Sequence, residues 1–483
     1  MKLNELLKGV QILKTNVQLD MEVSSVVYDS RKVEPGSLFV AITGFAADGN
    51  RFIPMALEKG AMVVVTAKEP EETVPFVLVE SDRMALAQIG ANYFGHPGKA
   101  LTLIGVTGTN GKTSSTLLLK HVLECVLGAK VGLMGTMENM IGMESIPTER
   151  TTPESFELQA LLAKMRDAGC THAIMEVSSH AIALERVGGL HYDVAAFTNL
   201  TEDHLDFHKT MENYCDTKAE LFARCEKGVA NADDEWFSRI CAKATCHMLP
   251  VSVKTKTGLH AEDQELLSDG VRFTAVMGET RVAVKLPIPG KFTVYNALTV
   301  LGMALQLGIS LEDAAKALES AKGVKGRVEV VPTPGKPYTV LIDYAHTPDG
   351  LENVLSSVRG YCQGRLIAVF GCGGDRDPIK RPIMGRIGAE LADIAIITSD
   401  NPRTEEPAAI IADIVKGIDP EKYQLEVIEN RVQAIHHALD IGRMHDIIVL
   451  AGKGHETYQE IHGVKHHLDE REVVAAYLEE TRE

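Results

Sequence analysis

Residues 107–113 read Thr-Gly-Thr-Asn-Gly-Lys-Thr and connect an apolar run, LTLIGV (101–106), to a helical pattern, STLLLKHVLECVL (115–127). This order of strand, glycine-rich turn and helix favours a phosphate-binding loop, because glycines let backbone N–H groups and the helix N-terminus face a phosphate. Lys112 would reach the β- and γ-phosphates, and the Thr113 hydroxyl would bind Mg²⁺. The strict pattern requires glycine at position 106, which is Val106 here, so a glycine-rich turn with an exposed lysine is the simpler alternative. We predict a nucleotide site formed by Gly108, Thr109, Asn110, Gly111, Lys112, Thr113 and Ser114.

Short apolar runs alternate with helical patterns on both sides of this loop, which is typical of parallel sheets with helical crossovers. Before the loop, SLFVAI (37–42), AMVVVTA (61–67) and PFVLVE (75–80) read as strands, and FGHPGKA (94–100) reads as a linker. We therefore predict an α/β protein with a phosphate-loop central domain and a doubly wound, Rossmann-like C-terminal domain. The predicted domains are 1–98, 99–325 and 326–483.

Four apolar strands of the third domain run directly into loops that carry Gly, Asp, Asn, Arg or His. They are VLIDYAHT (340–347), RLIAVFGCGGDRD (365–377), ADIAIITSDNPR (392–403) and DIIVLAGKGHE (446–456). Ligands of open α/β sheets bind beyond the carboxyl ends of the strands. The four loops are thus expected to form one side of a binding cleft.

Composition narrows the classes of function. Lys and Arg number 49 against 66 Asp and Glu, a formal net charge of −17, which argues against nucleic-acid or anionic-membrane binding. Residues 1–13 contain no long apolar stretch and no later run reaches about 18 apolar residues, so we expect neither export nor a membrane span. Its eight cysteines include no CxxC pair, and the Cys241, Cys246 and His247 group lacks further zinc ligands. We expect a cytoplasmic protein with reduced thiols, small-molecule substrates and a monomeric state.

Glu176 and His204 each follow a predicted strand, THAIMEV (171–177) or VAAFTNL (194–200). A carboxylate and an imidazole at the ends of adjacent strands can converge on one ion near the phosphates. Taken alone, each is more simply a polar loop residue, since Mg²⁺ prefers oxygen ligands. His204 also has the chemistry of a general base.

The loop TGTNGKT, together with EVSSH (176–180), NLTEDHLDFH (199–208) and YCDTKAELF (214–222), resembles the Mur ligase family. Members are ATP-dependent amide-bond ligases of peptidoglycan synthesis, and folylpolyglutamate synthetases are their relatives. The resemblance implies that Glu176 and His204 bind Mg²⁺ and that Lys218 is carbamylated to support a second Mg²⁺. The implied catalytic set is Lys112, Glu176, His204 and Lys218, with Thr113, Glu176, His204 and carbamylated Lys218 as metal ligands.

The same resemblance implies three groups of binding residues. ATP would also contact Asn296, Arg327, Asp343 and His346. A UDP-N-acetylmuramoyl-dipeptide would contact Ser25, Ser30, Arg31, Thr151, Thr152, Ser178 and Arg186. The incoming amino acid would contact Arg376, Asp400, Asn401, Arg403, Gly452 and Glu456.

The segment Asp400-Asn401-Pro402-Arg403 bears on the choice of amino acid, because family members that add meso-diaminopimelate carry DNPR and lysine-adding members generally lack the arginine. Diaminopimelate is lysine with an extra distal carboxylate, and arginine binds carboxylates in a bidentate manner. Arg403 could instead pair with Glu405 or Glu406 on the surface. We expect an ATP-dependent ligase that adds meso-2,6-diaminopimelate to UDP-N-acetylmuramoyl-L-alanyl-D-glutamate, through an acyl-phosphate and a tetrahedral intermediate. The alternatives are a lysine-adding ligase, a folylpolyglutamate-type ligase and a non-catalytic phosphate-loop ATPase.

Overall fold

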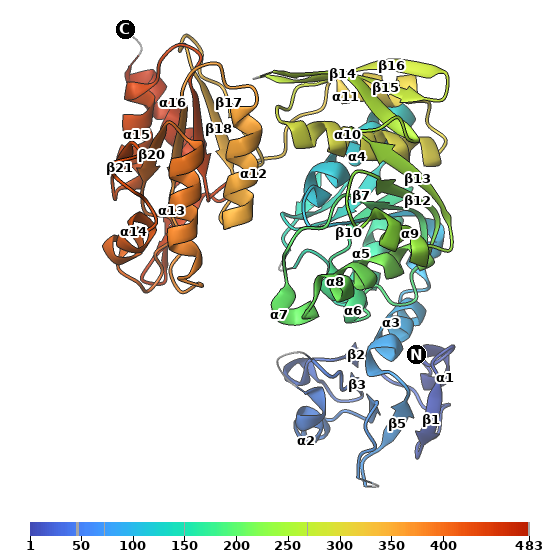
Figure 1. The fold of residues 1–483 in the computed structure, drawn as a ribbon. Helices are drawn as coiled ribbons and strands as arrows, with labels where there is room; N and C mark the ends of the chain where they lie inside the picture. Colours follow the sequence, from blue (N-terminus) through green and yellow to red (C-terminus); the bar gives the residue numbers. More distant parts are fainter. Residues whose placement is uncertain (45–47, 72, 149, 268, 482–483) are drawn as a thin grey trace. The chain divides into compact units, whose positions relative to one another are not determined.

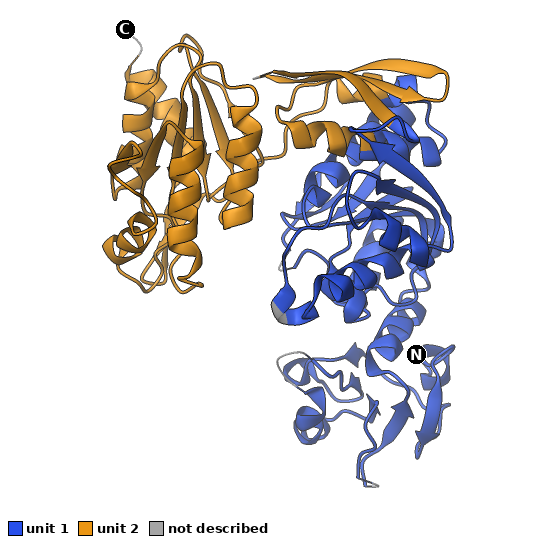
Figure 2. Ribbon diagram, in the orientation of Figure 1, with its two compact units in different colours: residues 1–259, 299–314 blue, residues 260–298, 315–483 orange. Residues whose placement is uncertain are grey.

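The computed structural model describes residues 1–44, 48–71, 73–148, 150–267 and 269–481 of the chain. The chain forms two compact units (Figure 2). Unit 1 contains residues 1–259 and 299–314, and unit 2 contains residues 260–298 and 315–483. The domain limits expected from the sequence stay predictions.

Unit 1 begins with a five-stranded sheet in the order β1-β5-β4-β3-β2 (Figure 1). Strands β2 to β5 run parallel, and β1 runs antiparallel along one edge. Every residue of β4 is buried, as expected for a parallel strand covered on both faces. The elements are β1 (Ile12–Thr15), β2 (Val26–Val27), η1 (Ser30–Lys32), β3 (Leu38–Val40), η2 (Gly49–Phe52), β4 (Val63–Thr66), β5 (Phe76–Val79), α1 (Leu3–Leu6), α2 (Ile53–Glu58), α3 (Asp82–Tyr93) and η3 (Pro97–Ala100).

The larger sheet of unit 1 places β6 (Thr102–Thr107) between β10 (His172–Glu176) and β11 (Tyr192–Phe197). These strands are parallel, and their registers pair Val106 with Glu176 and Thr107 with Phe197. Because the three strands end level with one another, the loops that follow them meet at one edge. Within unit 1 the strand order is β13-β12-β11-β6-β10-β7-β8-β9. The other elements are β7 (Val131–Met134), β8 (Asn139–Ile141), β9 (Glu144–Ile146), β12 (Cys225–Asn231), β13 (His247–Ser252), α4 (Lys112–Leu127), α5 (Ser155–Asp167), α6 (Ser179–Ala183), α7 (Leu205–His208), α8 (Met211–Ala219), η4 (Glu220–Ala223) and α9 (Phe237–Lys243).

Unit 2 contains a six-stranded sheet in the order β17-β18-β22-β19-β20-β21. The sheet is parallel except at β17, and its two faces carry separate cores. Leu341 packs in the core under α12, α13 and α14, while its neighbours Val340 and Ile342 pack in the core under α15 and α16. Helices on both faces confirm the doubly wound arrangement. The elements are β17 (Glu329–Val331), β18 (Thr339–Asp343), β19 (Leu366–Phe370), β20 (Ile394–Ile397), β21 (Leu425–Val427), β22 (Ile447–Ala451), α12 (Pro348–Arg359), α13 (Lys380–Leu391), α14 (Pro407–Val415), α15 (Arg431–Ile441) and α16 (Glu470–Glu480).

Two antiparallel parts were not foreseen in the sequence. Strands β14 (Leu259–Leu267), β15 (Gly270–Met277) and β16 (Thr280–Leu286) form a meander, and β23 (Tyr458–Ile461) pairs with β24 (Val464–His467) in a hairpin. Helices α10 (Lys291–Gln306) and α11 (Leu311–Leu318) each give residues to both units.

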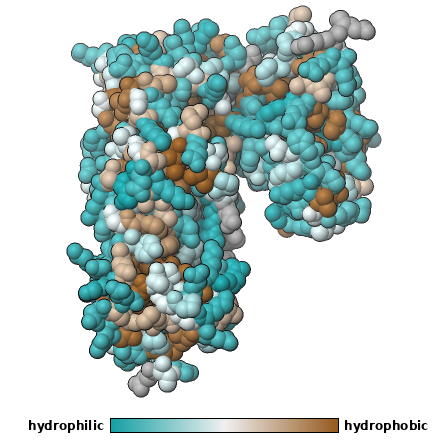
Figure 3. All heavy atoms as spheres, turned by 180° about the vertical axis from the view of Figure 1, so that it is seen from behind, coloured by the Kyte–Doolittle hydropathy of each residue, from teal (hydrophilic) through white to brown (hydrophobic). Residues whose placement is uncertain are grey.

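The surface drawn in Figure 3 is mostly hydrophilic, and apolar side chains occupy separate small areas of it. Among the described residues, none of the helices has the length and apolar character needed to span a bilayer.

Candidate active site

The loop after β6 has a backbone that requires glycine at its first turn. Gly108 has φ 147°, and a Cβ built there would lie 1.9 Å from Oγ1 of Thr198. That same hydroxyl donates a 2.6 Å hydrogen bond to the carbonyl of Asn110, and the backbone N–H of Asn110 donates to Oδ1 of Asn199 at 2.9 Å. The end of β11 thus holds the phosphate-loop backbone in place from one side.

Two further residues of the predicted phosphate site lie in the first turn of α4. Lys112, the first residue of α4, directs its ammonium back over the loop and donates to the carbonyls of Gly108 and Thr109 at 2.9 and 2.8 Å. Ser114 follows in the first turn of α4 and is partly exposed. An ammonium and a helix N-terminus at one turn supply the local positive charge that an acidic protein needs for a polyphosphate.

Glu176 is a buried carboxylate at the end of β10, with 1% of its surface exposed. Its Oε2 accepts hydrogen bonds from the hydroxyls of Thr113 and Thr136 at 3.1 and 2.9 Å, and Oε1 accepts from the backbone N–H of Thr136 at 3.0 Å. A Cβ built on Gly135 would come within 2.5 Å of Oε1, so this carboxylate lies in a tight backbone cradle. The side-chain atoms grouped here, the Glu176 carboxylate and the two threonine hydroxyls, are all oxygens, the ligand type that Mg²⁺ prefers.

Lys218 is also buried, with 1% exposed, on α8. Its ammonium donates to the carbonyl of Gly108 at 3.0 Å and lies 4.6 Å from the ring centroid of Tyr214. Burial lowers the pKa of Lys218 well below its ordinary value, and the charge of Lys112 lowers this pKa further. A lowered pKa increases the share of the neutral, nucleophilic amine, the form that carbamylation requires.

His204 lies in a different cluster, outside the contacts of Glu176. It has φ 55°, its Nε2 is 3.3 Å from Oδ2 of Asp203, and its ring stacks edge-on against His180 at 4.8 Å. In the described part of the chain, no contact joins His204 to Thr113 or Glu176, and no three His, Cys, Asp or Glu residues are grouped as a metal site. The predicted ligand role of His204 therefore stays a prediction.

Tyr214 is a residue that the sequence analysis missed. Its hydroxyl is 3.2 Å from the hydroxyl of Thr109, and its ring contacts Lys218 and lies 6.2 Å from that of His204. Tyr214 precedes Lys218 by four residues on α8, so the helical i, i+4 spacing was the available signal. It connects the phosphate loop with two of the four predicted metal ligands, Lys218 and His204.

Four predicted acceptor-site residues gather beside Glu176. The Thr152 hydroxyl donates to the carbonyl of Glu176 at 2.7 Å and lies 3.4 Å from the Ser178 hydroxyl, which caps α6. Arg186 donates to the Thr152 carbonyl at 3.4 Å, and Thr151 accepts from the Thr136 hydroxyl at 3.1 Å. The structure thus brings four of the predicted acceptor residues next to Glu176, one of the predicted metal ligands.

Three arginines surround one carboxylate next to this group, and two of them were missed. The Glu154 carboxylate, 6% exposed, lies 3.4 Å from Arg83, 3.9 Å from Arg150 and 3.5 Å from Arg186. Arg83 also donates to the carbonyls of Thr43 and Leu184 at 3.0 and 3.1 Å. With three cations around one anion, the cluster is net positive and suits an anionic ligand.

A cavity of about 1160 Å³ within unit 1 opens onto these arginines. Ser30 and Arg31 also line it; Ser30 is buried, and Arg31 pairs with Asp29 at 2.8 Å. Ser25, next to the lining residue Val26, bonds the hydroxyl of Ser37 at 2.9 Å. The predicted acceptor residues of both sheets in unit 1 therefore lie in or beside one cavity.

In unit 2, Asp343 ends β18 and accepts backbone N–H bonds from Val328 and Ala345, each at 2.8 Å. Burial raises the pKa of Asp343, and the charge of Arg327 opposes that shift. The Arg327 guanidinium lies 5.1 Å from the Tyr344 ring, and the ring of His346 lies 4.6 Å from the same ring. Arg327 and His346 therefore both lie against Tyr344, the residue that follows Asp343, while Asn296 is buried on α10.

Arg403 adopts a left-handed conformation, with φ 53°, which is uncommon for a residue with a side chain. Its guanidinium donates to the Gly374 carbonyl at 2.6 Å and lies 3.6 Å from Glu460. Glu405, the surface partner considered above, pairs with Arg381 at 2.8 Å instead. Arg403 is thus turned toward the loop after β19.

Arg376 lies in that loop. A Cβ built on Gly373 would lie 2.9 Å from Arg403 and 3.9 Å from Arg376, so two guanidinium-bearing side chains flank this glycine. The other predicted amino-acid residues come from the ends of β20 and β22. Asn401 donates to Glu456 at 2.8 Å, and a Cβ on Gly452 would lie 2.6 Å from Asp400.

Comparisons with known proteins fit this geometry. Three family profiles match the chain: the Mur ligase family, catalytic domain over residues 22–94, the Mur ligase middle domain over 106–304, and the Mur ligase, glutamate ligase domain over 326–454. The UDP-N-acetylmuramoyl-L-alanyl-D-glutamate--2,6-diaminopimelate ligase of Clostridium tetani is 47% identical over 99% of this chain and 100% of its own. The chain belongs to the Mur ligase family.

Solved structures of Mur ligases agree with the fold. A structure named UDP-N-acetylmuramoyl-L-alanyl-D-glutamate--2,6-diaminopimelate ligase superposes with a TM-score of 0.75 and 32% identity, covering 100% of this chain and 99% of the other. The MurF ligase of Thermotoga maritima in complex with ADP has a TM-score of 0.62 and 20% sequence identity, covering 95% of this chain and 99% of the other. The second likeness supports the fold alone. The α/β Mur ligase architecture expected from the sequence is thereby confirmed.

Proposed function

We propose that this chain is an ATP-dependent ligase that joins meso-2,6-diaminopimelate to the D-glutamate of UDP-N-acetylmuramoyl-L-alanyl-D-glutamate. The full-length identity to relatives named for this reaction supports the assignment. The observation that carries it is Arg403, whose guanidinium donates to the Gly374 carbonyl beside Arg376. Arg403 lies two residues after Asn401, which donates to Glu456. An arginine there can bind the distal carboxylate that distinguishes diaminopimelate from lysine.

The phosphate loop would hold ATP through its backbone N–H groups and Lys112. The glutamate carboxylate of the acceptor then attacks the γ-phosphate to give an acyl-phosphate and ADP. The amine of the incoming amino acid attacks the acyl carbon, and phosphate leaves from the tetrahedral intermediate. No protein nucleophile is needed, so positioning and charge stabilisation provide most of the rate.

The oxygen donors around Glu176 fit Mg²⁺, with Thr113 as a second ligand. His204 and a carbamate on Lys218 would complete the ligand set. Bound Mg²⁺ would supply positive charge that brings the triphosphate and the acceptor carboxylate together. As a ligand, His204 would not act as the general base.

The remaining predicted residues have roles suited to their chemistry. Arg327 would bind phosphate, Asp343 the ribose hydroxyls, Asn296 the adenine, and His346 would lie against the nucleotide. Thr151, Thr152, Ser178 and Arg186, with Ser25, Ser30 and Arg31, would bind the UDP-linked acceptor. We propose that the protein acts as a cytoplasmic monomer on small molecules, without nucleic-acid or membrane partners.

The experiment that tests this function is product analysis by mass spectrometry. The protein is incubated with ATP, Mg²⁺, the UDP-linked dipeptide and either meso-diaminopimelate or L-lysine. We expect the diaminopimelate tripeptide, and its absence with Lys112→Met. The lysine tripeptide alone would favour the lysine-adding alternative, and no product with either amino acid would contradict the proposal.

A further inference from the structure

Lys453 lies in the loop after β22 and has no exposed surface. Its ammonium donates to Oδ1 of Asn401 and to Oε2 of Glu456, each at 3.0 Å, and lies 5.6 Å from the ring of Tyr458. A buried ammonium is costly unless each contact is well made. Both hydrogen-bond partners belong to the proposed amino-acid site, whereas no role has so far been given to Lys453.

Lys453 determines which way the amide of Asn401 faces. Oδ1 accepts from Lys453 and from the backbone N–H of Glu460 at 2.9 Å, and Nδ2 donates to Glu456 at 2.8 Å. A flipped amide would place its NH₂ against two donors and its oxygen against a carboxylate. The ammonium therefore stabilises one orientation of the asparagine.

Lys453 also determines which oxygen of Glu456 is available. Oε2 accepts from both Lys453 and Asn401, and in the described part of the chain Oε1 receives no hydrogen bond. Charge-assisted bonds to one oxygen fix the rotation of the carboxylate. Oε1 is left to accept from an ammonium of the incoming amino acid.

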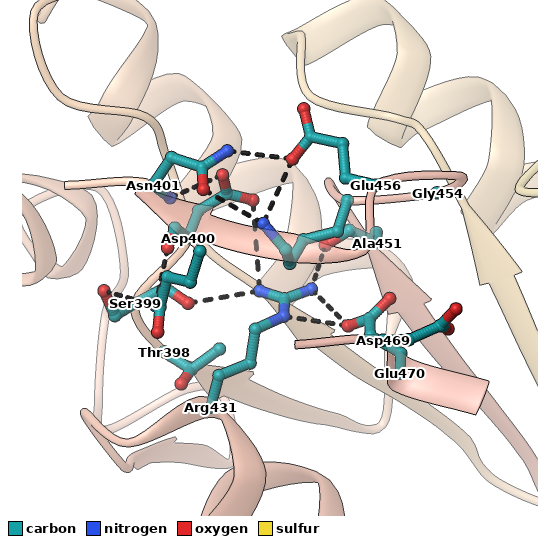
Figure 4. A network of polar contacts seen from close by, with 12 residues as sticks. Thr398, Ser399, Asp400, Asn401, Arg431, Ala451, Gly454, Glu456, Asp469 and Glu470 are labelled. Atoms are coloured by element: carbon teal, nitrogen blue, oxygen red, sulfur yellow. Dashed lines mark hydrogen bonds and ion pairs between the residues drawn. The ribbon is translucent and has the colours of Figure 1, made fainter. Parts of the chain in front are cut away.

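A second buried cation holds the two strand ends beneath this group (Figure 4). Arg431, at the start of α15, donates to the carbonyls of Ser399 and Ala451 and pairs with Glu470 at 2.8 Å. These carbonyls precede Asp400 and Gly452, so the ends of β20 and β22 are fixed relative to each other. Because Arg431 holds the two strand ends, loss of the Lys453 contacts should alter the positions of Asn401 and Glu456 without separating the strands.

We propose that Lys453 is a positioning residue for amino-acid binding, which acts by fixing the Asn401 amide and the Glu456 carboxylate. This inference rests on the proposed function. It predicts an effect on the amino-acid substrate and none on the nucleotide, a distinction that loss of overall stability would not produce.

The test is steady-state phosphate release by the full-length protein carrying Lys453→Met, with each substrate varied in turn. We expect KM for meso-diaminopimelate to rise roughly 10- to 100-fold, with KM for ATP unchanged within about twofold. Lys465→Met is the matched control, because exposed Lys465 lies 4.1 Å from the ring of the same Tyr458. Lys465→Met should retain the original KM for both substrates.

Lys453→Gln keeps a hydrogen-bond donor for Asn401 but removes the charge, so KM for meso-diaminopimelate should rise less than in Lys453→Met. This variant replaces Lys453→Met in the test if Lys453→Met does not fold. A double-mutant cycle with Glu456→Gln identifies the route of action. If Lys453 acts through Glu456, adding Lys453→Met to the Glu456→Gln variant should raise KM for meso-diaminopimelate by less than about threefold. The inference would be overturned if Lys453→Met left KM for meso-diaminopimelate unchanged, or if it raised this KM equally in the unmodified and the Glu456→Gln proteins. Either result would leave the proposed function intact. Absence of amino-acid-dependent phosphate release by the unmodified protein would overturn both.

Discussion

The hydroxyl of Thr113 donates a 3.1 Å hydrogen bond to the carboxylate of Glu176, although 63 residues separate them in the chain. Thr113 lies in the first turn of α4, and Glu176 ends β10. The parallel pairing of β6 with β10 brings their C-terminal ends together and so sets this contact. A hydroxyl and a carboxylate at the end of a phosphate loop are the oxygen donors that a nucleotide-bound Mg²⁺ needs.

Glu176→Gln should reduce kcat by roughly 10²- to 10³-fold, because the amide keeps the shape of the side chain but removes its negative charge. Phosphate release measured over a range of Mg²⁺ concentrations should show a higher Mg²⁺ requirement. Glu124→Gln is the control, since Glu124 pairs with Lys120 within α4. A kcat and Mg²⁺ dependence equal to those of the unmodified protein would exclude Glu176 as a ligand.

Lys218 should react with CO₂ at neutral pH. An ordinary lysine with a pKa of about 10.4 is protonated at pH 7, whereas the lowered pKa of Lys218 leaves a larger share as the neutral amine. Activity at pH 7.5 should therefore fall in CO₂-free buffer and recover when bicarbonate is added. ¹³C NMR with labelled bicarbonate should show a carbamate signal that Lys218→Met lacks. Full activity without CO₂, together with no signal, would rule out the carbamate.

Arg83→Met should weaken both the fold of unit 1 and acceptor binding. Arg83 makes two backbone hydrogen bonds and an ion pair with Glu154, while Arg150 and Arg186 remain near that carboxylate. We expect urea unfolding to show a loss of about 1–3 kcal/mol and KM for the UDP-linked dipeptide to rise.

Arg51→Met, at an exposed position of η2, controls for the loss of one positive charge near the N-terminal sheet. It should change neither the free energy of unfolding nor KM for the UDP-linked dipeptide. If Arg83→Met lowered stability but kept the acceptor KM, Arg83 would be a purely structural residue.

The sequence predicted those parts of the site that one local segment defines. The predicted turn lies at residues 108–111, between the end of β6 and the start of α4, and Glu176 lies at the predicted strand end. Apolar runs followed by glycines or charged residues likewise located β18, β19, β20 and β22 of the six-stranded sheet. Such patterns are local, because a parallel strand and the loop that follows it are adjacent in sequence.

Residues that act through distant partners could not be found in this way. Arg83 looks like an ordinary polar residue of α3, and only the packed structure shows that it bonds Leu184, 101 residues away. Lys453 lies between two glycines, and nothing local indicates that it is buried against Asn401, 52 residues away. The left-handed conformation of Arg403 depends on the β23–β24 hairpin, since its N–H donates to the Glu460 carbonyl at 3.0 Å.

We propose that Arg403 recognises the second carboxylate of diaminopimelate. The most direct measurement is the ratio of kcat/KM for meso-diaminopimelate to kcat/KM for L-lysine, determined for the unmodified protein and for Arg403→Ala. We expect a ratio of roughly 10³ or more for the unmodified protein. In Arg403→Ala this ratio should fall sharply, because the variant loses activity with diaminopimelate. A preference for lysine in the unmodified protein, or an unchanged ratio in Arg403→Ala, would contradict it.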